Sequence, residues 1–177
     1  MPGIGIQIGA RPDSGFDDPI GMLKDCHRRI EHFLGVLCLV AENALSRTLQ
    51  PEERSAAEAA LHYFHVGGRR HTADEEESLF PRLTAHGATA DLENLQHDHD
   101  EAEKLHVNVE QLYTTWFSTG SLSEQDQQQL LSATSRLRAL YAEHIALEDN
   151  VIFPRAAQVL AAAEIKTLGE EFRARRI

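Results

Sequence analysis

The sequence contains few cysteines and no apolar run of the length that a membrane span requires. Its two cysteines are Cys26 and Cys38. On one helix, which rises about 1.5 Å per residue, they would lie about 18 Å apart, beyond disulfide reach. No segment approaches the roughly 20 consecutive apolar residues of a membrane span, and the first ten residues lack the charged start and apolar run of a signal peptide. We therefore expect reduced thiols, a cytoplasmic location and no membrane partner.

Basic side chains are also scarce. The chain has 17 lysines and arginines against 28 acidic residues, which gives a formal charge of -11. Such a balance disfavours binding to phosphate backbones, so nucleic acid is not an expected partner. The only local basic cluster is Arg173, Arg175 and Arg176. We interpret it as a solvated helix end, where cations interact favourably with the helix dipole.

Patterns with a period of two are absent over any useful length, so the sequence predicts no strands. Apolar residues instead recur at helical spacing between clear start and stop signals such as Pro51 and Gly120. Residues 1–17 are rich in Gly and Pro without periodicity, which predicts a flexible N-terminal arm. The predicted helices span 18–48, 51 to the turn at Gly87, 92–119, 123 through Val151, and a short final segment at 161–174.

A chain of 177 residues fits one domain. Four long amphipathic helices with short connections favour packing as antiparallel neighbours around a common core. We therefore predict an all-α fold for residues 18–177, an up-down-up-down antiparallel four-helix bundle with a short C-terminal helix.

The second and fourth predicted helices carry the same motif. From His71 to Arg82 and from His144 to Arg155, the sequence has His, then Glu four residues later, then an aliphatic residue, Phe, Pro and Arg at identical offsets. This agreement indicates an internal duplication. Pro81 is expected to end or kink the second helix.

The duplication extends to a histidine in each preceding helix. His27 precedes His71 by nearly the same interval as His99 precedes His144. Residues four apart stand one turn above each other on a helix, so each His-x-x-x-Glu pair directs an imidazole and a carboxylate toward one point. The candidate metal ligands are His27, His71, Glu75, His99, His144 and Glu148.

A carboxylate on an apolar helix stripe must be protonated, paired or bound to metal when it is buried. Imidazole and carboxylate ligands without inward cysteines favour iron, manganese or zinc over copper(I). Two glutamates on facing helices can bridge two ions. Six protein ligands for two ions would also leave coordination positions open to an exogenous ligand.

This pattern, with Phe-Pro after each pair, resembles the hemerythrin-like (HHE cation-binding) domain over roughly residues 18–160. The resemblance implies a bundle around two iron ions, with the four histidines as terminal ligands and Glu75 and Glu148 as bridges. Oxygen-carrying hemerythrins have a fifth histidine ligand, and the duplication dictates none here, which argues against simple oxygen carriage. Their second bridge falls one residue later, so Asp149 is a rival to Glu148.

Several further residues are candidates for roles near the site. Glu76 and Asp149 lie about 100° around the helix from the motif glutamates, which favours supporting or surface roles over ligation. His106, two turns after His99, is a candidate fifth ligand or proton donor, with a core histidine as the alternative. Tyr141 lies one turn before His144 and either faces an open metal position or packs in the core.

The resemblance favours a metal-binding protein that binds or senses dioxygen, nitric oxide or peroxide, or that handles iron. One alternative is an enzyme on the same scaffold that decomposes peroxide or donates iron for iron–sulfur cluster repair. Another is a zinc-stabilised structural or interaction module. A ferritin-like oxidase would need two Glu-x-x-His motifs, and the sequence offers only Glu103-x-x-His106.

Overall fold

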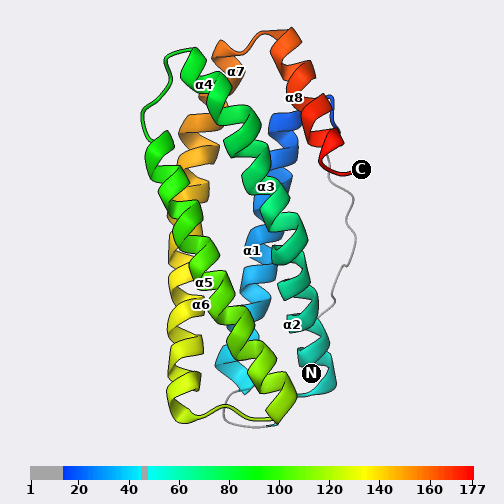
Figure 1. The fold of residues 1–177 in the computed structure, drawn as a ribbon, viewed down its shortest axis with the longest axis vertical. Helices are drawn as coiled ribbons and strands as arrows, with labels where there is room; N and C mark the ends of the chain where they lie inside the picture. Colours follow the sequence, from blue (N-terminus) through cyan, green and yellow to red (C-terminus); the bar gives the residue numbers. More distant parts are fainter. Residues whose placement is uncertain (1–13, 45–47) are drawn as a thin grey trace.

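The structure, a computed structural model, describes residues 14–44 and 48–177 as a bundle of helices, with no strand among them. In Figure 1 the chain descends along α1, ascends through α2, α3 and α4, descends along α5 and ascends through α6 and α7. The all-α bundle predicted from the periodicity is confirmed. The helices are α1 (Pro19–Ala44), α2 (Pro51–Tyr63), α3 (Arg69–Asp74), α4 (Phe80–Ala85), α5 (Leu92–Thr119), α6 (Glu124–Leu147), α7 (Phe153–Val159) and α8 (Ala162–Ala174).

The helix boundaries follow the local signals in the sequence. Pro51 opens α2, where its missing N–H costs nothing, and Ser123 caps α6 by accepting a hydrogen bond from the Asp126 backbone N–H at 3.1 Å. Gly120 ends α5 in the left-handed conformation, with φ of 79°. The first helix was predicted to run to residue 48. The described part of α1 extends to Ala44, residues 45–47 lie outside the described residues, and Thr48 is not helical.

Two long rods of the bundle contain wide π-helical turns. These turns span Phe64–Gly68 and Glu75–Leu79 in the rod from α2 to α4, and Glu148–Ile152 in the rod from α6 to α7. Proline lacks an N–H and its ring clashes with the carbonyl four residues earlier, which normally breaks a helix. Pro81 and Pro154 each follow a π-helical turn directly after a Phe, and the rod continues beyond both. Of the two alternatives predicted for Pro81, an end or a kink, the end is excluded because the helix continues to Ala85, and the wider turn accommodates the proline.

The core consists of two apolar clusters along the bundle axis. In α1, His27 lies between Leu23 of one cluster and Ile30 of the other. In each of the other three rods, too, the motif histidine falls between residues of the two clusters. The bundle therefore holds one layer of polar side chains with apolar packing above and below it.

The short α8 packs across the end of the bundle beside α1 and the Glu75–Leu79 turn. Residues 14–17, which we assigned to the N-terminal arm, also contact this region. The Arg173 guanidinium lies 4.9 Å from the centroid of the Phe16 ring, and the Ser14 backbone N–H donates to Asp25 at 2.8 Å. A Cβ at Gly169 would lie 1.9 Å from the Phe16 carbonyl oxygen, so this contact requires glycine. The remainder of the predicted arm, residues 1–13, lies outside the described residues.

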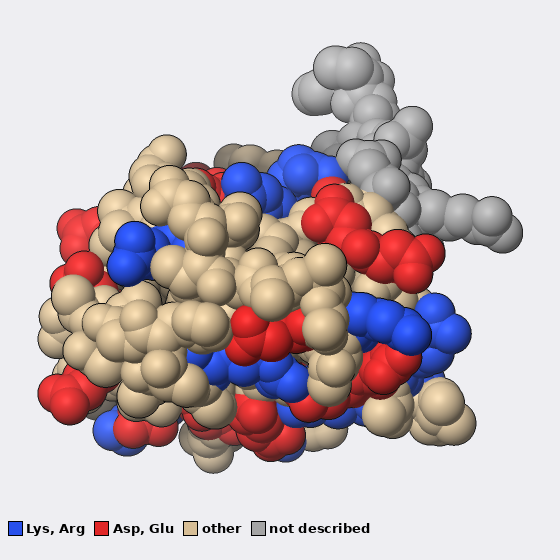
Figure 2. Space-filling view, turned by 90° about the horizontal axis from the view of Figure 1, so that it is seen from above, with Lys and Arg blue, Asp and Glu red and all other residues tan. Residues whose placement is uncertain are grey.

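The prediction of a solvated helix end agrees with the exposure of Arg173 but is wrong for Arg175 and Arg176. The side chains of Arg175 and Arg176 are only 20% and 22% exposed, and both bind the buried carboxylate of Asp74. On the end of the molecule seen in Figure 2, acidic and basic side chains are interspersed. Within the described ranges, no helix has the length and apolar character needed to cross a membrane.

Candidate metal centre

The structure brings the six predicted ligands together in the polar layer. Four rods supply them, with His27 on α1, His99 on α5, and a His-x-x-x-Glu pair on each of the other two rods. All six side chains are buried, and the two glutamates are completely inaccessible to solvent. The relative exposures are His27 1%, His71 3%, Glu75 0%, His99 9%, His144 2% and Glu148 0%.

These side chains form two groups that share both glutamates. In each group, the four ligand atoms lie within 4.8 Å of one another. Neither Cys26 nor Cys38 belongs to a group; both are buried free thiols. Two carboxylates that belong to both groups could bridge two adjacent cations. The groups are His27, His71, Glu75 and Glu148, and Glu75, His99, His144 and Glu148.

Helix geometry places one histidine beside each glutamate. The His71 Nε2 atom lies 3.3 Å from Glu75 Oε1, and His144 Nε2 lies 3.2 Å from Glu148 Oε2, each pair one turn apart. Each glutamate also meets a histidine from another rod. His99 Nε2 lies 3.4 Å from Glu75 Oε2, and His27 Nε2 lies 3.0 Å from Glu148 Oε2. Each carboxylate thus contacts one imidazole from each group.

The buried carboxylates are close to imidazoles but are not hydrogen-bonded to them. All four oxygens of Glu75 and Glu148 lack a hydrogen-bond partner among the described residues, as do the Nε2 atoms of His27 and His99. Burying polar atoms without partners costs free energy, and native proteins rarely accept it. Bound cations would satisfy these atoms together, so the donor set fits metal ions.

The outward nitrogens of three histidines contact carboxylates around the site. The Nδ1 atom of His99 lies 2.8 Å from Glu76, and that of His27 lies 3.0 Å from Asp149. Asp98 approaches His144 Nδ1 at 3.3 Å. Such contacts fix the ring orientation and leave Nε2 facing the site. The supporting role expected for Glu76 and Asp149 agrees with this geometry, and neither joins the two groups. The role of Asp98 was missed, because no repeat offset marks it.

The buried ligand side chains differ in the direction of their pKa shifts in the metal-free protein. Burial, and then the negative charge of Glu148, raises the pKa of Glu75 well above its ordinary value. Burial acts to raise the pKa of Glu148 too, but the close contacts with His144 and His27, and their positive charge when protonated, outweigh burial and lower it. Burial lowers the pKa of His71, whereas Glu148 overcomes burial at His27 and raises its pKa. Without metal, therefore, the surroundings favour the protonated forms of Glu75 and His27 and the ionised form of Glu148.

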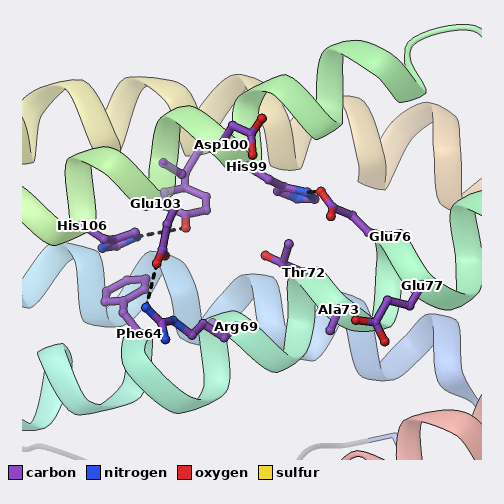
Figure 3. Close-up of a pocket in the computed structure, with 13 residues that line it drawn as sticks. Phe64, Arg69, Thr72, Ala73, Glu76, Glu77, His99, Asp100, Glu103 and His106 are labelled. Atoms are coloured by element: carbon purple, nitrogen blue, oxygen red, sulfur yellow. Dashed lines mark hydrogen bonds and ion pairs between the residues drawn. The ribbon is translucent and has the colours of Figure 1, made fainter.

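A pocket of about 340 Å³ reaches the centre at His99. It is lined by Glu76 and Thr72 near His99 and by Phe64 and His106 at the far end (Figure 3), and Tyr141, which is hydrogen-bonded to His106, also lines it. The pocket links the polar layer to the outside of the bundle between α3 and α5.

The two remaining candidate ligands, His106 and Tyr141, contact each other, and the Tyr141 ring also packs edge-on against the ligand His144, with ring centroids 6.4 Å apart. His106 Nε2 lies 3.0 Å from the Tyr141 hydroxyl, and its ring packs at 4.2 Å from Phe64. Burial lowers the pKa of His106 to about 4, so its imidazole is neutral at pH 7. Glu103 stands one turn after His99, but it pairs at the surface with Arg69 at 2.7 Å. Within the described residues, neither His106 nor Glu103 joins a group with the six inner ligands.

The two halves share one feature that sequence reasoning missed. Glu75 and Glu148 each begin a π-helical turn, at the same offset from the motif histidine. The signal was present, because Pro81 and Pro154 occupy positions where a regular helix would clash. The phenylalanine before each proline covers a histidine, as the ring stacking of Phe153 on His27 at 5.3 Å illustrates. These rings shield the polar layer from solvent.

A model of the hemerythrin HHE cation-binding domain matches residues 18–156. The chain belongs to this family. The assignment suggested by the motif is thereby confirmed, and with it a helical domain that binds cations. The match covers the four rods and both His-x-x-x-Glu pairs, whereas α8 lies beyond it. No curated protein matches the chain.

Proposed function

We propose that this HHE domain holds two iron ions in its polar layer and uses the pair to bind or sense a small ligand such as dioxygen, nitric oxide or peroxide. The observation that carries the proposal is the sharing of Glu75 and Glu148 between the two groups of ligands. In this assignment the two glutamates bridge the ions, and His27, His71, His99 and His144 are terminal ligands.

Iron is the preferred metal because of the donor set. Structural zinc sites are usually closed, four-coordinate and often rich in cysteine, whereas here two carboxylates stand among four imidazoles. Carboxylate-bridged pairs of iron or manganese inside helical bundles use similar donors. Six protein ligands do not fill the coordination of two such ions, which leaves room for an exogenous ligand.

The pocket at His99 supports access by a small molecule. His106 and Tyr141 line the pocket and are both neutral at pH 7, because burial lowers the pKa of His106 to about 4 and raises that of Tyr141. The Tyr141 hydroxyl therefore keeps its proton and can donate a hydrogen bond, either to its partner His106 or to a ligand in the pocket. When bound, the iron pair supplies redox chemistry and open coordination. The chain's residues hold the pair, exclude water and admit the ligand.

The test is an optical titration of the protein loaded anaerobically with iron(II). We expect nitric oxide to produce new absorbance that saturates, and Tyr141→Phe to weaken this binding while leaving the iron content unchanged. We expect peroxide consumption no faster than that of an equal amount of free iron. Sustained peroxide turnover well above free iron would instead establish the enzyme alternative, and the absence of any spectral response would refute ligand binding.

A further inference from the structure

We propose that Asp74, Arg175 and Arg176 form a clamp by which α8 positions Glu75 as a bridging ligand, so that docking of α8 and binding of metal strengthen each other. This inference rests on the proposed metal site. It concerns residues that lie outside both groups of inner ligands.

The arginines of the clamp hydrogen-bond to side chains at and beside the turn that begins at Glu75. Arg175 donates to Asp74 Oδ1 at 3.0 Å, to Ser78 Oγ at 2.7 Å and to Glu77 Oε2 at 3.1 Å. Arg176 donates to the other oxygen of Asp74 at 2.6 Å. One C-terminal segment thus holds side chains on both sides of Glu75 in the chain.

Burial makes these contacts obligatory. Asp74 and Ser78 are completely inaccessible to solvent. A buried carboxylate without compensating charge is strongly unfavourable, and charge-assisted hydrogen bonds from guanidinium groups are among the strongest contacts that compensate it. If the arginines leave, Asp74 must move toward water or take up a proton. Either change displaces the backbone of the adjacent Glu75.

The duplication shows that the clamp exists in one half only. The residues equivalent to Asp74 and Ser78, 73 positions later, are Leu147 and Val151. Val151 is 48% exposed, and neither side chain can bind a guanidinium group. Asp74 and Ser78 are therefore not part of the duplicated motif. They occur where α8 packs against the Glu75–Leu79 turn.

The arginines also lie outside the region that defines the family. The family match ends at residue 156, before α8 begins at Ala162. The clamp thus joins an added helix to a ligand-bearing turn of the cation-binding domain. Because coupling between two sites is reciprocal, a helix that favours the metal-binding position of Glu75 must itself be held more firmly when metal is bound.

The experiment compares Arg175→Gln with Arg173→Gln in the full chain. Both variants remove one positive charge near the end of α8, but Arg173 lies over the Phe16 ring and makes no clamp contact with Asp74. Iron(II) affinity is measured against a competing chelator, the visible spectrum is recorded with cobalt(II), and hydrogen exchange in α8 is followed with and without metal. Asp74→Asn, which keeps the side-chain shape, is a second variant in case Arg175→Gln fails to fold.

We expect Arg175→Gln and Asp74→Asn to weaken metal binding by up to about 10-fold and to alter the cobalt spectrum, because they act on Glu75 through the backbone, whereas removing a direct outer partner of a ligand costs about 10- to 100-fold. Arg173→Gln should match the wild type in metal affinity and in the cobalt spectrum. Metal should slow hydrogen exchange in wild-type α8. Unchanged affinity and spectrum in the Arg175 and Asp74 variants, or an equal loss in Arg173→Gln, would overturn the clamp alone. A wild-type chain that binds no metal would overturn the clamp and the proposed function together.

Discussion

A carboxylate oxygen of Glu75 lies within 4.8 Å of one of Glu148, although the two residues come from different rods and neither is exposed to solvent. Two buried carboxylates at this separation cannot both remain charged without cations between them. In the metal-free protein the raised pKa of Glu75 favours its protonated form, and Glu148 lies 3.0 Å from His27 Nε2. Metal ions resolve the conflict differently, because they would replace the protons on Glu75 and His27.

Metal binding should therefore release protons at pH 7. The pKa values of Glu75 and His27 are both raised in the metal-free protein, and ligands must lose their protons to bind metal. Calorimetric titration with iron(II) or manganese(II) in buffers of different ionisation enthalpy measures this release. Heats that do not depend on the buffer would contradict the assigned charge states.

Glu75→Gln should stabilise the metal-free protein increasingly as the pH rises. The pKa of Glu75 is raised by folding, so its contribution to stability is complete below its ordinary pKa of 4.5 and is lost as the pH rises toward the folded value. Urea denaturation between pH 5 and 8 should show wild-type stability falling relative to the variant. A difference in the free energy of unfolding that does not change with pH would refute this. Glu103→Gln, at an exposed surface ion pair, is the matched control.

Asp149→Asn and Glu76→Gln should each weaken metal binding without abolishing it. Their carboxylates contact the outer nitrogens of His27 and His99 and hold Nε2 toward the site. Removing such a partner typically costs 10- to 100-fold in affinity. Chelator competition measures the change, with Asp100→Asn, at an exposed residue of the pocket wall, as control. Complete loss of one ion in Asp149→Asn would instead make Asp149 a ligand.

Much of this centre could be predicted from the sequence, because repetition carried the information. The offsets in the two halves identified six residues on four helices, and helical spacing placed each His beside its Glu. Asp98 and the clamp could not be found in this way, since their contacts join segments far apart in sequence without a repeat. Arg175 and Arg176 were misread for the same reason: only the packing of α8 brings them to Asp74.

The π-helical turns were overlooked although their signal was local. A proline in an otherwise helical pattern predicts a break, and both breaks were absorbed as wide turns that begin at the ligands Glu75 and Glu148. His106 was judged from its spacing alone. Its bond to Tyr141 depends on how α5 meets α6, which spacing does not specify.

Phe153→Ala should destabilise the protein by about 3–5 kcal/mol, the usual cost of truncating a buried Phe. The ring is 1% exposed and stacks on His27, so its loss also admits water to the polar layer. Thermal or urea unfolding of the metal-free protein gives the change in the free energy of unfolding. Phe117→Ala, at a half-buried ring at the opposite end of α5 from His99, should cost clearly less. Equal losses would argue against a special role for Phe153.

The most direct test of the account is the metal content of the chain after anaerobic loading with iron(II) and removal of unbound metal. The account predicts two ions per wild-type chain and loss of both in His71→Ala/His144→Ala, because each group then lacks a terminal ligand. The control His62→Ala/His65→Ala, at two exposed histidines, should still bind two ions. A wild-type chain that holds neither iron nor manganese, or a His71→Ala/His144→Ala chain with unchanged metal content, would contradict the account.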